Sequence, residues 1–286
     1  MSVATSSPVP WRRGRRRIAG LRIIVTGASS GVGRAVAIEL SRRGAHVLAT
    51  ARRSDRLRDL ARASAGTEIL HEPGDIRDAA FRSRLVATAA DRLGGLDSIV
   101  AAAGGGAIGP FRTAAPKVFA DIVDLDFVAP AELVRSSLPL LVAGHDPAIV
   151  FVGSILGLHP LPLHGEYCAA KAALRSLAGT LRTELACDGI DVLHVNLGPT
   201  VSEFWEALAA GERPPWSRGR RMPAERAAAA IVDGMERRRA EITPGWQAKG
   251  FAFAARFLPG LIDRLAARHL KQVGSEDRPA PPGRKP

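Results

Sequence analysis

The residues best suited to chemistry are a tyrosine and a lysine one helical turn apart. Tyr167 is the only tyrosine of the 286-residue chain, and Lys171, one of five lysines, follows it by four residues. On a helix this spacing places both side chains on one face. Ser154 ends an apolar run that is typical of a buried strand, thirteen residues before Tyr167. We expect these three groups to act together.

These side chains suit proton transfer to or from an oxygen atom. The pKa of a tyrosine hydroxyl lies at about 10, too high for ready proton exchange at neutral pH. A neighbouring ammonium favours the phenolate and lowers that pKa. A serine hydroxyl can donate a hydrogen bond to a substrate oxygen as charge develops on it. The predicted chemistry is proton exchange with a carbonyl or alcohol while a cofactor moves the hydride.

A glycine-rich turn that opens a helix could hold such a cofactor. Residues 26–33 read Thr-Gly-Ala-Ser-Ser-Gly-Val-Gly after the first expected strand. Glycines let the backbone approach a pyrophosphate, and the free N–H groups at a helix start attract its charge. A structural tight turn is the alternative. The residues expected to bind a dinucleotide here are Thr26, Gly27, Ser29, Ser30, Gly31, Val32 and Gly33.

The end of the second expected strand indicates which dinucleotide binds. An NAD site usually has an acid there for the ribose 2′-hydroxyl, but this chain has Arg52 and Arg53. Guanidinium groups suit a 2′-phosphate, so we expect NADP(H) rather than NAD(H). The alternative is a pair of solvated arginines. Asp75 and Ile76 follow the third strand, where the Asp75 carboxylate could accept the adenine amino group or instead cap a helix.

The elements that position these residues alternate between strand and helix. Short runs of Val, Ile and Leu suit strands buried on both faces, and the alternation implies right-handed crossovers. The predicted fold class is α/β, a Rossmann-like doubly wound parallel β-sheet flanked by helices in a single domain. The expected strands cover residues 22–26, 46–51, 68–72, 98–102, 148–153, 191–196 and 240–243. The expected helices cover residues 31–43, 54–65, 79–93, 116–143, 165–187 and 223–238. Pro130 and Pro139 could kink the helix at 116–143.

The ends of the chain differ in composition from this core. Residues 1–20 carry five arginines and no acid, and we expect a disordered basic arm there. Residues 274–286 are expected to be a second disordered tail. The domain between them covers 21–273, with a substrate lid at 200–222 and an apolar C-terminal helix at 248–273.

Composition excludes several protein classes. Two cysteines cannot form a disulfide scaffold or a cysteine-based zinc cluster, and no metal site is expected. The formal net charge is +12, but five of these charges lie in the arm and the rest are dispersed, so we expect no nucleic acid partner. Glycines and prolines interrupt the uncharged run at 148–165, which argues against a membrane span. We expect a cytoplasmic protein, with peripheral membrane contact as an alternative that is not favoured.

The motifs occur together in the order and spacing of one known family. Over residues 20–245 the sequence resembles the classical short-chain dehydrogenase/reductase family, through the turn at 26–33, Asp75, the Ser154…Tyr167-x-x-x-Lys171 set and the loop after the sixth strand. The resemblance implies that Tyr167 is the acid/base, that Ser154 polarises the substrate and that Lys171 holds the nicotinamide ribose and tunes Tyr167. It also implies cofactor contacts from Ala103, Gly104, Pro199, Thr200 and Ser202. A homodimer or homotetramer packed through the helices at 116–143 and 165–187 is implied as well.

Two positions depart from the family pattern. Residues 101–104 read Ala-Ala-Ala-Gly where the family usually has Asn-Asn-Ala-Gly. Asp126 aligns with a helix asparagine that helps a water-mediated proton relay to the lysine in the family. A carboxylate there would stabilise the ammonium and partly offset its effect on the pKa of Tyr167. We expect an active enzyme with its pH optimum shifted upward; alternatively, Asp126 points to solvent.

Apolar residues in the expected lid indicate a large apolar substrate. Phe204, Trp205, Leu208 and Trp216 suit a bulky ketone or secondary alcohol of lipid or steroid type. Ordinary packing of a short helix is the alternative. The apolar C-terminal stretch could close the active site, bury a subunit interface or lie on a membrane.

The leading interpretation is an NADP(H)-dependent oxidoreductase of class EC 1.1.1. It would transfer hydride between nicotinamide and a carbonyl or secondary alcohol of a small-molecule substrate, acting as a reductase. One alternative is an NADP(H)-binding sensor or assembly protein of the same fold with weak or no turnover, which the missing asparagines motivate. Another is a basic surface binder of membrane or nucleic acid.

Overall fold

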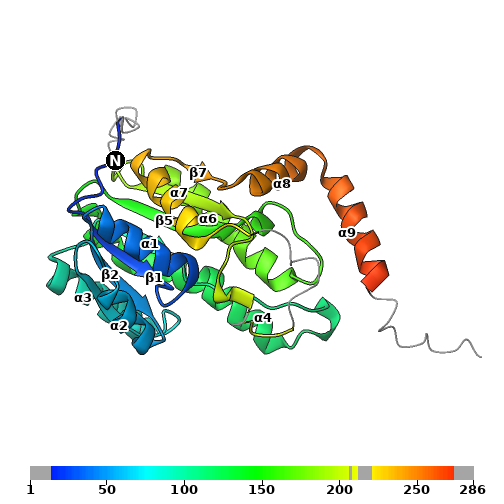
Figure 1. Ribbon diagram of the computed structural model, residues 1–286, viewed down its shortest axis with the longest axis horizontal. Coiled ribbons are helices and arrows are strands. Elements are labelled where there is room, and N and C mark those ends of the chain that lie inside the picture. Colours follow the sequence, from blue (N-terminus) through cyan, green and yellow to red (C-terminus); the bar gives the residue numbers. More distant parts are fainter. Residues whose placement is uncertain (1–13, 206–207, 212–220, 274–286) are drawn as a thin grey trace, which may run out of the picture.

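The computed structural model describes residues 14–205, 208–211 and 221–273 (Figure 1). Within these residues, seven parallel strands form one sheet in the order β3-β2-β1-β4-β5-β6-β7, so the predicted doubly wound single domain is confirmed. The strands are β1 (Arg22–Thr26), β2 (His46–Ala51), β3 (Ile69–Pro73), β4 (Ser98–Ala101), β5 (Ala148–Ser154), β6 (Asp191–Leu197) and β7 (Glu241–Ile242). The α-helices are α1 (Gly31–Arg42), α2 (Ser54–Arg62), α3 (Ala79–Leu93), α4 (Pro116–Val123), α5 (Ala129–Val142), α6 (Gly165–Glu184), α7 (Ala224–Glu236), α8 (Trp246–Phe257) and α9 (Pro259–Val273).

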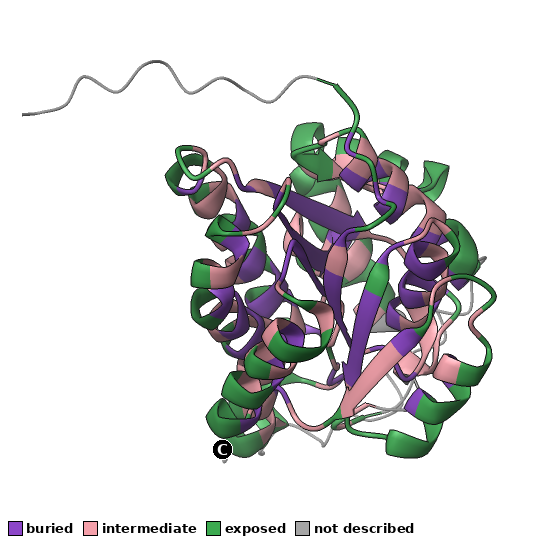
Figure 2. Cartoon of the chain, turned by 90° about the vertical axis from the view of Figure 1, so that its left-hand side faces the viewer, coloured by how far each residue is buried: buried purple, intermediate pink, exposed green. Residues whose placement is uncertain are grey.

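The sheet is buried because its strands carry apolar residues on both faces. Ile23, Ile24 and Val25 of β1 are fully buried, and every residue of β5 is buried. Helices α1 and α7 cover one face, while α3, α5 and α6 cover the other, with their outer sides exposed (Figure 2). All the strands are parallel, so their carboxyl ends meet at one edge, where ligands bind in open α/β sheets.

The single long helix expected at 116–143 is interrupted. Helix α4 ends at Val123, a π-helical turn η2 covers Asp124–Val128, and α5 begins at Ala129. Pro130 accounts for the interruption: it lacks an N–H, and in a regular α-helix its ring would clash with the carbonyl of Asp126. The wider turn accommodates the ring and places Asp126 in the interior.

The helix expected at 248–273 is two helices. A residue that precedes proline disfavours the helical conformation, and Leu258, before Pro259, leaves it with φ −134° and ψ 43°. Helix α9 consequently runs away from the sheet (Figure 1). Exposed apolar side chains of this region are Phe253, Phe257, Leu258, Leu261 and Leu265. Across the described residues, no helix is both long and apolar enough to cross a membrane.

Part of the expected disordered arm is packed into the fold. Arg16 and Ile18 are each 3% exposed. The Arg16 guanidinium lies 2.7 Å from the carboxylate of Asp191 and 3.4 Å from that of Asp146, and it donates to the carbonyl of Met235 at 3.1 Å. These partners compensate for the loss of hydration of the buried charge. The predicted boundary at residue 20 is therefore wrong, because the domain includes Arg16. Residues 1–13 and 274–286, with their predicted disorder, lie outside the described part.

Candidate active site

Ser154, Tyr167 and Lys171 come together at the carboxyl edge of the sheet. Ser154 is the last residue of β5, and the other two lie one turn apart near the start of α6. The Ser154 hydroxyl accepts the N–H of Leu156 at 3.1 Å and lies near the Tyr167 hydroxyl, whose pKa it lowers. The ammonium of Lys171 lies 5.7 Å from the centre of the Tyr167 ring. Two hydroxyl groups and a cation thus share one site.

Asp126 is fully buried beside Lys171. Its Oδ1 lies 2.9 Å from Lys171 Nζ, and its carboxylate accepts the N–H of Gly105 at 3.3 Å. The alternative that Asp126 points to solvent is therefore wrong. Burial raises the pKa of Asp126, although Lys171 opposes this shift. Burial alone would lower the pKa of Lys171, but the neighbouring charges, chiefly that of Asp126, raise it.

The surroundings of Tyr167 keep its hydroxyl protonated. Burial raises the pKa of Tyr167, the Lys171 cation lowers it, and the Asp126 anion raises it again. The hydrogen bond with Ser154 acts in the lowering direction. The net direction is upward, so the expectation of a lowered pKa holds for the contribution of Lys171 but not for the sum. A protonated phenol is the form that can act as a general acid.

The turn between β1 and α1 is so tight that it requires glycine. Gly27 has a φ of 69°, and a Cβ there would lie 2.7 Å from Ala103 Cα. A Cβ on Gly33 would overlap the carbonyl of Gly27. Ser30, at the N-cap of α1, makes no capping hydrogen bond within the described structure. The first N–H groups of α1 therefore remain available to an anion, and the cradle fits the phosphates of a dinucleotide.

Thr26 connects this turn to the residues after β4. Its Oγ1 accepts the N–H groups of Ala102 at 3.1 Å and of Ala103 at 3.0 Å. A hydroxyl has two acceptor lone pairs, and both serve this connection. Thr26, predicted to lie in the cofactor site, thus ties β1 to the loop where the family asparagines are missing. Gly104 lies next in this loop, where a Cβ would be 3.3 Å from Lys171 Nζ.

Arg53 is the centre of a polar cluster after β2. Its guanidinium donates to Ser30 Oγ at 2.8 Å and to Ser29 Oγ at 3.1 Å, and it lies 2.7 Å from the carboxylate of Glu203. Arg52 is exposed next to it. Glu203 was not predicted from the sequence, where its only signal is a position next to Ser202 in the expected lid.

Asp75 follows β3 with its carboxylate bound to Arg77. Arg77 Nη2 lies 2.6 Å from Asp75 Oδ2, and the Arg77 N–H donates to Oδ1 at 3.0 Å. These hydrogen bonds lower the pKa of Asp75. The helix-cap alternative is wrong for Asp75, because Asp78 caps α3 by accepting the N–H of Ala80. Ile76 is buried beside this turn.

Phe204, in the segment after β6, packs against the phenol ring of Tyr167. The ring of Phe204 meets that of Tyr167 edge-on, with 5.5 Å between centroids and 62° between planes. A Cβ on Gly106 would clash with the Phe204 ring. Leu208 is partly buried, and the backbone of Trp205 closes the short helical turn η4 (Glu203–Trp205). Trp216 lies outside the described residues.

The base of this segment is anchored on both sides. The Thr200 hydroxyl donates to the carbonyl of Gly198 at 3.0 Å, and the carbonyl of Pro199 accepts the N–H of Met222 at 3.0 Å. Ser202 packs directly on the glycine-rich turn, since a Cβ on Gly31 would lie 2.8 Å from Ser202 Cβ. The expected cofactor residues of the glycine-rich turn and of the segment after β6 therefore face one another.

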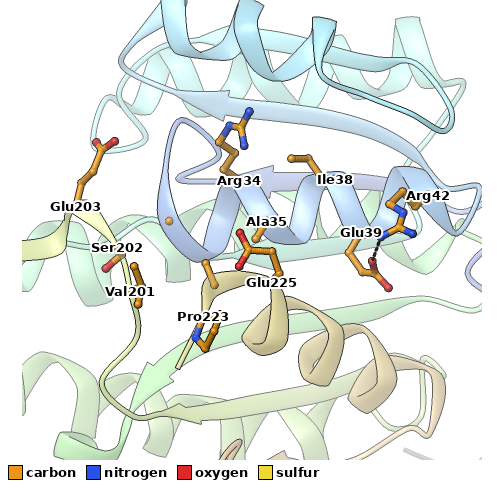
Figure 3. Close-up of a pocket in the computed structure, with 12 residues that line it drawn as sticks. Arg34, Ala35, Ile38, Glu39, Arg42, Val201, Ser202, Glu203, Pro223 and Glu225 are labelled. Atoms are coloured by element: carbon orange, nitrogen blue, oxygen red, sulfur yellow. Dashed lines mark ion pairs between the residues drawn. The ribbon is translucent and has the colours of Figure 1, made fainter. Parts of the chain in front are cut away.

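A cavity of about 480 Å³ opens beside this contact, between α1, residues 201–203 and the start of α7 (Figure 3). Gly31, Ser202 and Glu203 belong to its lining, and Ile38 and Glu225 lie farther along. Among the described residues that line it, none is Ser154, Tyr167 or Lys171. The cavity adjoins the dinucleotide cradle but does not reach the phenol.

Comparisons with known proteins agree with this arrangement. A family model described as short chain dehydrogenase matches residues 22–213. A "Hydroxysteroid 11-beta-dehydrogenase 1-like protein" from Macaca fascicularis is 30% identical over 246 residues, which cover 84% of this chain and 84% of that protein. An "Uncharacterized oxidoreductase" from Myxococcus xanthus is 32% identical over 253 residues, covering 87% and 96% of the two chains. The crystal structure of a short-chain dehydrogenase from Streptomyces avermitilis has a TM-score of 0.74 and 28% identity, covering 90% of this chain and 99% of that chain.

Proposed function

The chain belongs to the short-chain dehydrogenase family, and from this premise we propose that it is an NADP(H)-dependent reductase of a bulky apolar ketone. The observation that carries the proposal is the grouping of Ser154, Tyr167 and Lys171 at the sheet edge that also holds the glycine-rich turn. A protein that only bound a dinucleotide would not need a partly buried phenol beside a buried cation at that place.

The cofactor would be held by two parts of the site. The start of α1 and the glycine-rich turn would bind its phosphates, and Arg53, with Ser29 and Ser30, would bind a 2′-phosphate. Lys171 would bind the nicotinamide ribose. We infer the preference for NADP(H) from the positive charge of Arg52 and Arg53. The 2′-phosphate of NADP(H) is an anion that their guanidiniums can bind, whereas the 2′-hydroxyl of NAD(H) is uncharged. When bound, the nicotinamide supplies the hydride.

The residues of this chain would supply the proton and bind the substrate oxygen. Tyr167 would donate its hydroxyl proton to the carbonyl oxygen, and the Ser154 hydroxyl would donate a hydrogen bond to the same atom. The ammonium of Lys171 would stabilise the phenolate left on Tyr167, and Asp126 would keep Lys171 charged. The raised pKa of Tyr167 favours this direction, since the acid form is present at neutral pH.

The substrate class is inferred from the surroundings of the phenol. Phe204 packs on Tyr167 and leaves an apolar wall where a substrate would approach. One relative bears a hydroxysteroid dehydrogenase-like name, which supports steroid-type ketones as the first compounds to test.

A spectrophotometric assay tests the proposal. NADPH consumption would be followed with a panel of apolar ketones, in wild type and in Tyr167→Phe, with NADH in parallel. We expect turnover with NADPH and a loss of about 10²- to 10⁴-fold in the variant, the usual contribution of general acid catalysis. Thermal shift with NADPH would show that the variant still binds. Equal inactivity of both proteins, with NADPH bound, would favour the alternative of a binder without turnover.

We also propose that the protein forms a homo-oligomer through α4, η2, α5 and α6. Two exposed apolar side chains support this: Phe119 on α4 is 40% exposed, and Val128 on η2 is 39% exposed. Light scattering of the purified protein measures the mass, and a value equal to the chain mass of 30.2 kDa would contradict the proposal.

A further inference from the structure

Glu203 forms an ion pair with Arg53, the arginine that would bind the 2′-phosphate. Its Oε2 lies 2.7 Å from Arg53 Nη1, and its Oε1 lies 3.7 Å from Arg56 Nη1. The two carboxylate oxygens thus face two guanidiniums, as the oxygens of a phosphate would. Hydrogen bonding to Arg53 lowers the pKa of Glu203, so the side chain remains an anion.

Glu203 is also connected to the phenol of Tyr167 through its chain neighbour Phe204. It lies in the turn η4 next to Phe204, whose ring packs edge-on against Tyr167. Ser202, on the other side of Glu203, rests against Gly31 of the glycine-rich turn. Residues 201–203 run past the start of α1 (Figure 3), and Phe204 follows directly. The segment 202–204 therefore contacts the phosphate cradle, the arginine and the phenol.

We propose that Glu203 is an internal competitor of the cofactor 2′-phosphate, and that the phosphate displaces it and moves Phe204 off Tyr167. The proposal rests on the proposed function, because it assumes that NADP(H) binds at Arg53. It adds a specificity-determining residue and a link between cofactor binding and access to the phenol. Glu203 and Phe204 are neighbours in η4, and successive Cα atoms are only about 3.8 Å apart, so a displacement of the Glu203 backbone by the phosphate would be transmitted to Phe204.

The exchange is feasible because the pair is partly exposed. The side chains of Arg53 and Glu203 are 44% and 32% accessible, and exposed ion pairs contribute little to stability. A phosphate monoester carries a charge of about −1.5 to −2 and has three acceptor oxygens, against one charge and two oxygens for the carboxylate. The phosphate is therefore the stronger ligand for Arg53. NADH has no group that replaces Glu203.

Binding of 2′,5′-ADP and 5′-AMP by calorimetry tests the competition without any catalysis. In Glu203→Gln we expect 2′,5′-ADP to bind about two- to fivefold tighter than in wild type, the range for one exposed ion pair. Binding of 5′-AMP should stay unchanged, because it lacks the 2′-phosphate. Glu225→Gln is the matched control: it removes an exposed carboxylate that lines the same cavity, and it should leave both affinities unchanged.

Hydrogen exchange tests the link to the phenol. Adding 2′,5′-ADP to wild type should speed amide exchange at residues 202–204, and 5′-AMP should not. Equal affinity of wild type and Glu203→Gln for 2′,5′-ADP, or unchanged exchange at 202–204, would overturn the proposal while leaving NADP(H) dependence intact. Absence of 2′,5′-ADP binding in both proteins would instead overturn the cofactor assignment and this proposal with it.

Discussion

Lys171 Nζ lies 2.9 Å from Asp126 Oδ1 in a site where both side chains are shielded from solvent. Both charges act on Tyr167: the Lys171 cation lowers the pKa of its hydroxyl, and the Asp126 anion raises it. Asp126 reaches this position through the π-helical turn before Pro130. Together with burial, which is the largest cause, the pair therefore determines the proton affinity of the phenol, and it depends on the π-helical turn between α4 and α5.

Replacing Asp126 by asparagine is expected to move the pH dependence of the reaction downward. Asp126→Asn keeps the shape of the side chain and removes a negative charge that raises the pKa of Tyr167. In the proposed mechanism alcohol oxidation needs the phenolate of Tyr167, so it should become faster at lower pH, and ketone reduction should begin to decline at lower pH than in wild type. Rate profiles in both directions measure this, and overlaying profiles of variant and wild type would contradict it.

Removing Lys171 alone is expected to destabilise the fold. In Lys171→Met the buried Asp126 loses its cation, and breaking a buried pair on one side costs about 3–5 kcal/mol. The double variant Asp126→Asn/Lys171→Met should recover most of the loss, because asparagine can still accept the N–H of Gly105. Urea unfolding of the three proteins measures the difference. No recovery in the double variant would show that the charge pair is not the cause.

Arg16→Ala is expected to reduce stability by a similar amount, about 3–5 kcal/mol. The change leaves Asp146 and Asp191 with Arg238 as their remaining cation among the described residues, and it empties a buried position. Arg17→Ala is the matched control, since Arg17 is exposed and should change stability by less than about 0.5 kcal/mol. Thermal unfolding of Arg16→Ala and Arg17→Ala measures the difference. Equal melting temperatures of the two variants would indicate that residues 14–20 form a loose arm.

His194 is expected to make the fold acid-sensitive. It is 1% exposed, both ring nitrogens lack hydrogen-bond partners among the described residues, and burial lowers its pKa to about 4 from the usual 6.5. Between these values the unfolded chain binds a proton that the folded state does not. Stability is therefore fully present above pH 6.5 and falls toward pH 4, by about 3 kcal/mol from this group.

Urea unfolding between about pH 7.5 and 4.5 measures this acid dependence. His194→Leu lacks the titrating group and should show a shallower loss over the same range. Parallel pH dependence in wild type and variant would assign the acid sensitivity to the carboxylates instead.

Local sequence determined the order of strands and helices and most of the site. A strand buried on both faces is an apolar run wherever it lies, so β1, β2 and β5 were predicted to within one residue. The spacing of Tyr167 and Lys171 fixes their common face because the helical period is local. The sequence also shows Pro130 and Pro259, each of which disfavours a continuous helix. The form of the interruption, a π-helical turn before Pro130 and a break between α8 and α9 at Pro259, depended on the packing around them.

Only the tertiary structure decided contacts between residues far apart in sequence. Arg16 reads as part of a basic tail until Asp146 and Asp191, 130 and 175 residues later, surround it. Glu203 meets Arg53 across 150 residues, and the net direction of the Tyr167 pKa follows from burial as well as from the adjacent cation. Electrostatic interactions depend on distance and solvent exposure in three dimensions, and sequence spacing specifies neither beyond a turn of helix.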